Sequence, residues 1–93
     1  MYTHVVFFVL HDSADVPDMI RRLQQMSDHI PSLQALEAGA DDAPSERSAH
    51  LCLITRFADP AGLEAYRIHP VHQEFLAWAR PRIARSWKVD FVS

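Results

Sequence analysis

Short apolar runs and longer amphipathic stretches alternate along the chain, and this pattern predicts its secondary structure. Residues 3–10 form an apolar run short enough for a strand, with apolar side chains on both faces. From Val16 to Ile30, apolar residues recur every three or four positions, which predicts an amphipathic helix. A weaker strand is expected at 33–38 and a strong one at 49–57, and the polar stretch between them predicts an exposed loop.

The second half of the chain adds a helical region and a last strand. Asp59 followed by Pro60 is typical of a helix start, with a capping carboxylate before a proline at the first helical position. Pro70 interrupts the helical pattern, which then resumes. Residues 86–92 alternate between apolar and polar, which predicts a strand. The order β-α-β-β-α-β predicts a ferredoxin-like α+β protomer, with a single domain over residues 1–93.

One face of such a sheet has no helix to cover it. We expect this uncovered face to carry an apolar set from the first and third strands, namely Val6, Phe8, Leu10, Leu51, Leu53 and Phe57. A patch of this size exceeds what a monomer in water normally exposes. A symmetric dimer needs only one self-complementary patch. The sequence therefore predicts a homodimer in which two sheet faces close into a shared α/β barrel.

Composition and charge narrow the class of protein. The chain has 93 residues, of which 48% are hydrophobic, with one cysteine and a net charge of −3. A single cysteine excludes an internal disulfide, and scattered basic residues in an acidic chain argue against nucleic-acid binding. The apolar run near the N-terminus is too short for a signal peptide or a membrane span. We therefore expect a cytoplasmic protein that contacts neither nucleic acid nor membrane.

The segment 66–72 (YRIHPVH) brings a phenol and two imidazoles together where proline breaks a helix. Imidazole transfers protons near neutral pH, and a phenol can donate a hydrogen bond to a developing enolate or alkoxide. Tyr66 and His72 are therefore candidate catalytic residues, with His4 or His69 as orienting partners. The corresponding function is that of a cofactor-independent lyase, cyclase or isomerase acting on a carbonyl compound.

The same residues are compatible with two other functions. In one, the barrel cavity binds a small apolar or aromatic ligand, with the lining residues His4, Val6, Phe8, Leu53, His69 and Lys88. In the other, the chain is a structural or protein-interaction module, in which Tyr66 packs in the core and His69 and His72 only shape the helix break. The spacing of these two histidines suits a metal, but a catalytic zinc site needs a third ligand. Neither a metal nor a cofactor is predicted.

The chain resembles the Dabb family, the stress-responsive dimeric α/β barrel domain. The resemblance is carried by His4-Val5-Val6-Phe7-Phe8, Ile30-Pro31, Phe57 with the Asp59 helix start, and Tyr66-x-x-His69-Pro70-x-His72 followed by Asp90. It implies a ferredoxin-like protomer in a homodimer around a central cavity, and a stress-linked or accessory role. Enzymatic members include polyketide cyclases of the olivetolic-acid type, whose tyrosine and histidine roles fall by position on Tyr66 and His72, with His4 lining the pocket. Leu23 stands where such cyclases have a pocket tyrosine.

Overall fold

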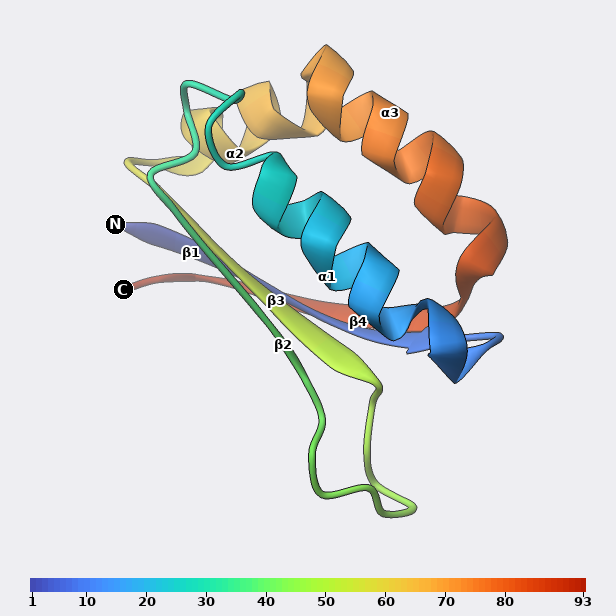
Figure 1. Cartoon of the computed structure of the whole chain (residues 1–93). Coiled ribbons are helices and arrows are strands. Elements are labelled where there is room, and N and C mark those ends of the chain that lie inside the picture. The colour runs from blue at the N-terminus through green and yellow to red at the C-terminus, as the bar shows by residue number, and fades with distance from the viewer.

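A four-stranded antiparallel sheet lies against a layer of helices in the computed structural model, which describes residues 1–93 (Figure 1). The strands are β1 (Tyr2–Leu10), β2 (Ala35–Ala40), β3 (Leu51–Phe57) and β4 (Ile83–Val92). The helices are α1 (Val16–Gln25), α2 (Pro60–Ile68) and α3 (Pro70–Ala79), with 3-10 turns at Ser13–Asp15 and Arg80–Arg82. The strand order β2-β3-β1-β4 is that of the ferredoxin-like α+β fold, which confirms the predicted class.

Prolines and side-chain caps set the starts of α2 and α3. The Asp59 carboxylate accepts a hydrogen bond from the Gly62 amide at 2.9 Å, as its position before Pro60 predicts. Pro70 lacks an amide hydrogen, so α2 ends before it and α3 begins with it in a new direction. His69 is extended between the two helices. None of the helices combines the length and the apolarity that crossing a bilayer requires.

Several element boundaries differ from those predicted, and the first and third strands shift by only one or two residues. α1 ends at Gln25, short of Ile30, although Ile30 stays buried because the turns that follow α1 still pack on the core. β2 occupies 35–40 rather than 33–38. β4 begins at Ile83, earlier than expected, because the 3-10 turn that follows α3 leads directly into extended backbone.

The core lies between the helices and the helix-facing side of the sheet. The sheet contributes to it the buried residues Val6, Phe8, Leu10, Leu51, Leu53 and Phe57. The prediction that these residues form the uncovered face is therefore wrong. The first strand is apolar on both faces, so the alternation of its side chains did not reveal which face the helices cover.

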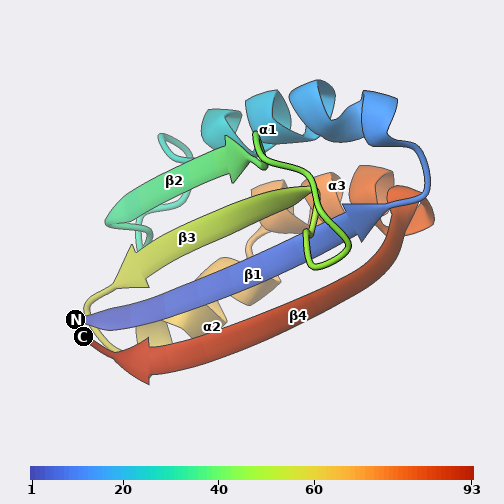
Figure 2. The same cartoon turned by 90° about the horizontal axis from the view of Figure 1, so that it is seen from below.

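The uncovered face carries the other set of alternating side chains. Phe7, Trp87, Val89 and Phe91 lie there with 41–56% of their surface exposed. The β1–β4 register places Phe7 opposite Trp87 and Val5 opposite Val89, so the apolar side chains form one continuous patch. Figure 2 shows this side of the sheet with the helices behind it. An apolar uncovered face is present as predicted, but it is built from different residues.

Candidate functional site

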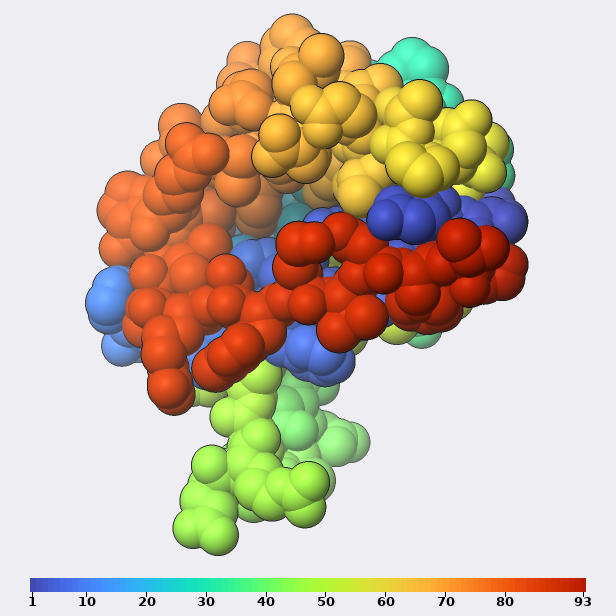
Figure 3. All heavy atoms as spheres, turned by 180° about the vertical axis from the view of Figure 1, so that it is seen from behind, coloured from blue at the N-terminus to red at the C-terminus, as the bar shows by residue number.

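An open trough separates α3 from β4 on the helix-covered side of the sheet. α1 packs along β2, and α2 packs on β3 and β1, which leaves β4 at the edge of the helical layer. Figure 3 shows the resulting hollow between α3 (orange) and β4 (red), with blue and teal atoms of the first part of the chain at its bottom. The side of β4 that faces this trough is polar and consists of Ser86, Lys88 and Asp90. The trough therefore has a polar wall along β4.

His72, in the first turn of α3, is held in one orientation by a backbone carbonyl. Because the helix breaks at Pro70, the carbonyl of Arg67 is free to accept other donors. His72 Nδ1 lies 3.0 Å from this oxygen, and the Gln73 side-chain amide donates to the same oxygen at 2.7 Å. A carbonyl can only accept, so Nδ1 carries the proton and Nε2 of the neutral ring keeps a free lone pair. That lone pair is what a general base requires.

Burial lowers the pKa of His72 below its usual value of 6.5. The hydrogen bond to Arg67 acts in the opposite direction, and the electrostatic effect of the nearby His4, Arg67 and Arg80 side chains lowers the pKa further. The balance leaves the His72 side chain uncharged at neutral pH. It can therefore accept a proton there.

Tyr66 packs against His72 from the end of α2. The two ring centroids are 4.3 Å apart, and the Tyr66 ring also lies 5.3 Å from that of Phe57. Tyr66 is only 2% exposed, yet its hydroxyl makes no hydrogen bond within the chain and is not sealed from solvent. Burial raises the pKa of Tyr66 well above its usual value of 10.0. The group is therefore a neutral phenol with a hydrogen free to donate.

His4 on β1 and Asp90 on β4 form a hydrogen-bonded pair across the sheet. The register places them opposite each other, and His4 Nδ1 is bonded to one carboxylate oxygen. The Lys88 ammonium donates to the other oxygen at 2.5 Å. Burial raises the pKa of Asp90, but the hydrogen bonds from Lys88 and His4 outweigh it, so the pKa lies below its usual value of 3.8. The ionised carboxylate fixes the proton of His4 on Nδ1.

The structure thus brings together three of the predicted site residues. His4 and His72 are near enough for a charge on one to lower the pKa of the other, and the Tyr66 ring contacts that of His72. A base, an orienting imidazole and a neutral hydrogen-bond donor are the groups that proton transfer next to a carbonyl requires. No three side chains of His, Cys, Asp or Glu gather closely enough to hold a metal ion.

The remaining predicted site residues occupy other positions. His69 Nδ1 accepts a hydrogen bond from the Val71 amide at 3.1 Å, so this side chain caps the start of α3. Val6, Phe8 and Leu53 lie in the core beneath the helices instead of between two sheets. A cavity between sheets therefore cannot be lined by these three side chains.

The sequence alone assigned no role to the groups that hold the two imidazoles. Asp90 carries a usable signal, because an antiparallel pairing of the first and last strands brings it opposite His4, on the same side as Lys88. The Arg67 carbonyl and the Gln73 side chain have no such signal in the sequence, because their role depends on where the helix breaks. The only hint in the sequence is Pro70.

Comparison with known proteins places the fold among its relatives. The family model described as the stress responsive A/B barrel domain (Dabb) matches residues 2–93. None of the curated proteins matches the sequence.

Solved structures share the fold over nearly the whole chain. A dimeric ferredoxin-like protein of unknown function from Thermobifida fusca has 25% identity and a TM-score of 0.87, covering 99% of this chain and 90% of its own. A Dabb family protein from Mesorhizobium loti has 23% identity and a TM-score of 0.82, covering 99% and 95%. A hydroxynitrile lyase from Passiflora edulis has 14% identity and a TM-score of 0.84, covering 99% and 92%. These last two likenesses show the fold alone.

Proposed function

Because this chain belongs to the stress responsive A/B barrel domain (Dabb) family, and because a fold does not itself fix an activity, we propose a function from the trough: cofactor-independent acid–base chemistry on a carbonyl compound. The reaction is that of a lyase, cyclase or isomerase. The observation that carries this proposal is the convergence of Tyr66 and His72 in complementary protonation states, one a neutral donor and the other a neutral base.

In the proposed reaction, His72 Nε2 removes a proton from the carbon next to the carbonyl group. The electron pair of the broken C–H bond moves onto the carbonyl oxygen, and the Tyr66 hydroxyl donates a hydrogen bond to the enolate oxygen that forms. The protonated His72 then returns the proton to carbon or to a leaving oxygen, which restores the neutral imidazole. His4, oriented by Asp90, positions the substrate beside His72.

We also propose that the chain is a homodimer formed through its uncovered sheet face. Phe7, Trp87, Val89 and Phe91 are large apolar side chains on one continuous patch, which a monomer would leave in water. A two-fold axis between two such faces covers both patches at once. The Thermobifida fusca structure, which is described as dimeric, supports this assembly.

Binding of a small apolar ligand without turnover is a second candidate function for the same trough. Leu76 follows His72 by one helical turn, so both lie on the same side of α3, and Leu76 is only half-buried. Half-buried Ile83 begins β4 at the end of the trough. An apolar or aromatic group would be desolvated against such side chains.

Deuterium exchange into benzylacetone tests the two candidates. We expect NMR in D2O to show exchange next to the carbonyl above the buffer rate, and Tyr66→Phe and His72→Ala to abolish the excess. The matched control is His69→Asn, which removes an imidazole outside the cluster and supplies another good helix cap. Exchange that persists in both site variants would contradict the acid–base proposal. Binding of benzylacetone by the parent chain without exchange would favour the second candidate.

A further inference from the structure

The β2–β3 connection, residues 41–50, projects from the sheet on the side away from the helices, and we call it the arm (Figures 1 and 3). Residues 41–47 are exposed. The hydrogen bonds of residues 42–47 stay within the arm, so its tip is bonded to no other part of the chain. No hydrogen bond therefore ties the tip of the arm to the rest of its own protomer.

The arm is nevertheless an organised piece of structure. At its base, the Asp41 amide donates to the His50 carbonyl at 3.0 Å, and the His50 amide donates to Phe8 of β1 at 2.8 Å. At its tip, the Ser48 amide donates to the Ser45 carbonyl at 3.1 Å, and the Ser45 amide donates to the Ser48 hydroxyl at 3.0 Å. Ordering a segment costs about 1–2 kcal/mol of entropy per residue, which favourable contacts must offset. The hydrogen bonds at its base and tip give the arm a defined shape.

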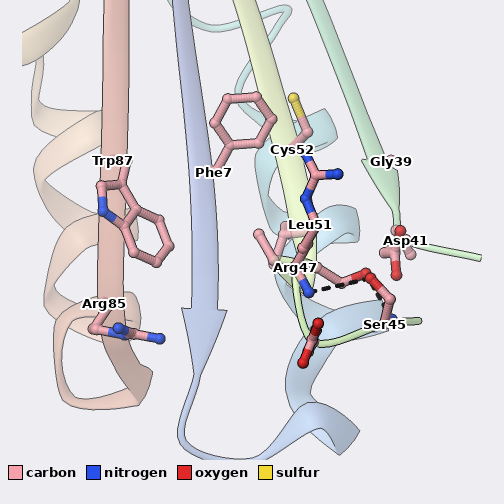
Figure 4. A pocket seen from close by; sticks show the side chains of 13 residues that line it. Phe7, Gly39, Asp41, Ser45, Arg47, Leu51, Cys52, Arg85 and Trp87 are labelled. Carbon is pink, nitrogen blue, oxygen red and sulfur yellow. Dashed lines mark hydrogen bonds between the residues drawn. The ribbon is translucent and has the colours of Figure 1, made fainter. Parts of the chain in front are cut away.

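The arm and the uncovered sheet face form one concave surface. A hollow of about 1010 Å3 lies between them, with Ser45 and Arg47 of the arm on one side and Phe7 and Trp87 of the sheet on the other (Figure 4). The arm thus stands as a wall directly beside the apolar patch that the proposed dimer covers. Whatever packs on that patch also meets the arm.

The arm stands where a facing sheet would pack. Face-to-face sheets pack about 10 Å apart. The arm is built of bends and turns, and it projects on the side of the sheet that has no helices (Figure 1). In the proposed dimer, the arm therefore meets the second protomer.

The charges on the two surfaces are complementary. The arm carries three carboxylates, Asp41, Asp42 and Glu46, and one cation, Arg47. The uncovered face presents Arg56 and Arg85, neither of which is paired with a carboxylate in its own chain, and a single carboxylate, Glu37 of β2. An acidic arm beside a face with unpaired arginines fits a second copy of the same surface better than it fits an anionic partner.

We propose that the arm clasps the second copy of this chain, so that each dimer is held by two arms as well as by the paired sheet faces. This role rests on the homodimer proposed above and adds a contact that the flat sheet faces do not provide. The two-fold symmetry of the dimer supplies both contacts at once.

Shortening the arm tests the proposal. Residues 42–49 are replaced by Asn-Gly, the preferred two-residue hairpin turn, and the dimer dissociation constant is measured by sedimentation over a dilution series. We expect the constant to rise by at least about tenfold. Trp87→Ala is the matched variant, which weakens the sheet contact and leaves the arm intact. If the shortened chain dimerises as tightly as the parent, the proposed clasp by the arm is wrong. If the parent chain is monomeric at every concentration, the proposed dimer itself is wrong.

Photocrosslinking provides a second measurement that does not depend on the folding of the shortened chain. A benzophenone amino acid replaces the exposed Glu46 near the tip of the arm. Irradiation is expected to yield a covalent dimer from the parent background and much less from the Trp87→Ala background. Crosslinks confined to the same chain would overturn the clasp.

Discussion

The substitution Tyr66→Phe removes the hydroxyl and keeps the ring, so it tests the role of the hydroxyl apart from the packing of the ring. A buried hydrogen bond contributes about 1 kcal/mol to stability on average, and a tyrosine that loses such a bond is destabilised accordingly. The Tyr66 hydroxyl makes no hydrogen bond within the chain, so that contribution is absent. The ring itself stays in contact with Phe57 and His72. We therefore expect the free energy of unfolding to change by less than about 0.5 kcal/mol.

The same substitution removes the only neutral phenol next to His72. A hydrogen-bond donor to a developing oxyanion typically accelerates a reaction by about 100-fold or more. We expect benzylacetone exchange to fall by at least this factor, with Tm within about 3 °C of the parent chain. The contrasting variant is Tyr66→Ala, which also removes a ring that is only 2% exposed and is expected to cost about 3–5 kcal/mol.

Urea unfolding followed by circular dichroism, together with exchange measured by NMR, gives the two quantities for each variant. A loss of more than about 1 kcal/mol in Tyr66→Phe would refute this expectation, since the hydroxyl would then have a partner inside the folded chain. It is equally refuted if Tyr66→Phe leaves both stability and exchange unchanged while His72→Ala abolishes exchange. That result would mean that a group other than Tyr66 donates the hydrogen bond to the oxyanion.

Three further outcomes follow from the same geometry. The pKa of His72 is lowered by burial, so exchange should stay constant above pH 6.5 and fall only below it, as a pH–rate profile will show. The pKa of Asp90 is lower in the folded than in the unfolded chain, so its carboxylate stabilises the fold above pH 3.8. That stabilisation should disappear as the pH falls through the folded pKa, and Asp90→Asn should flatten the urea-unfolding profile there. Phe7→Asp buries a charge in the proposed sheet contact and should raise the dimer dissociation constant by about 100-fold in a sedimentation series, whereas Ile68→Asp, on an exposed helix position, should not.

Much of the fold could be predicted from local patterns. The caps and prolines, such as Asp59 before Pro60 and the break at Pro70, determine where helices begin because they act on neighbouring backbone groups. The boundary of α1 could not be predicted, because Ile30 is buried by the turns that follow the helix and not by the helix itself.

The candidate site could be predicted only in part. Tyr66 and His72 are neighbours on the two sides of one helix break, so the sequence alone brings them together. Asp90 and the Arg67 carbonyl are different, because one reaches His4 through strand pairing and the other is freed by the loss of a helical hydrogen bond. Neither contact can be predicted from the spacing of residue types along the chain.

The sequence by itself determined the order of the elements, the break at Pro70 and the surplus of apolar side chains, since each depends on local periodicity or composition. Only the tertiary structure decided which side of β1 faces the helices. Both faces of that strand are apolar, so the choice depends on which side the helices cover after the strands have paired. That choice placed Val6 and Phe8 in the core, left Phe7 on the uncovered face, and put His4 beside Asp90 in the trough.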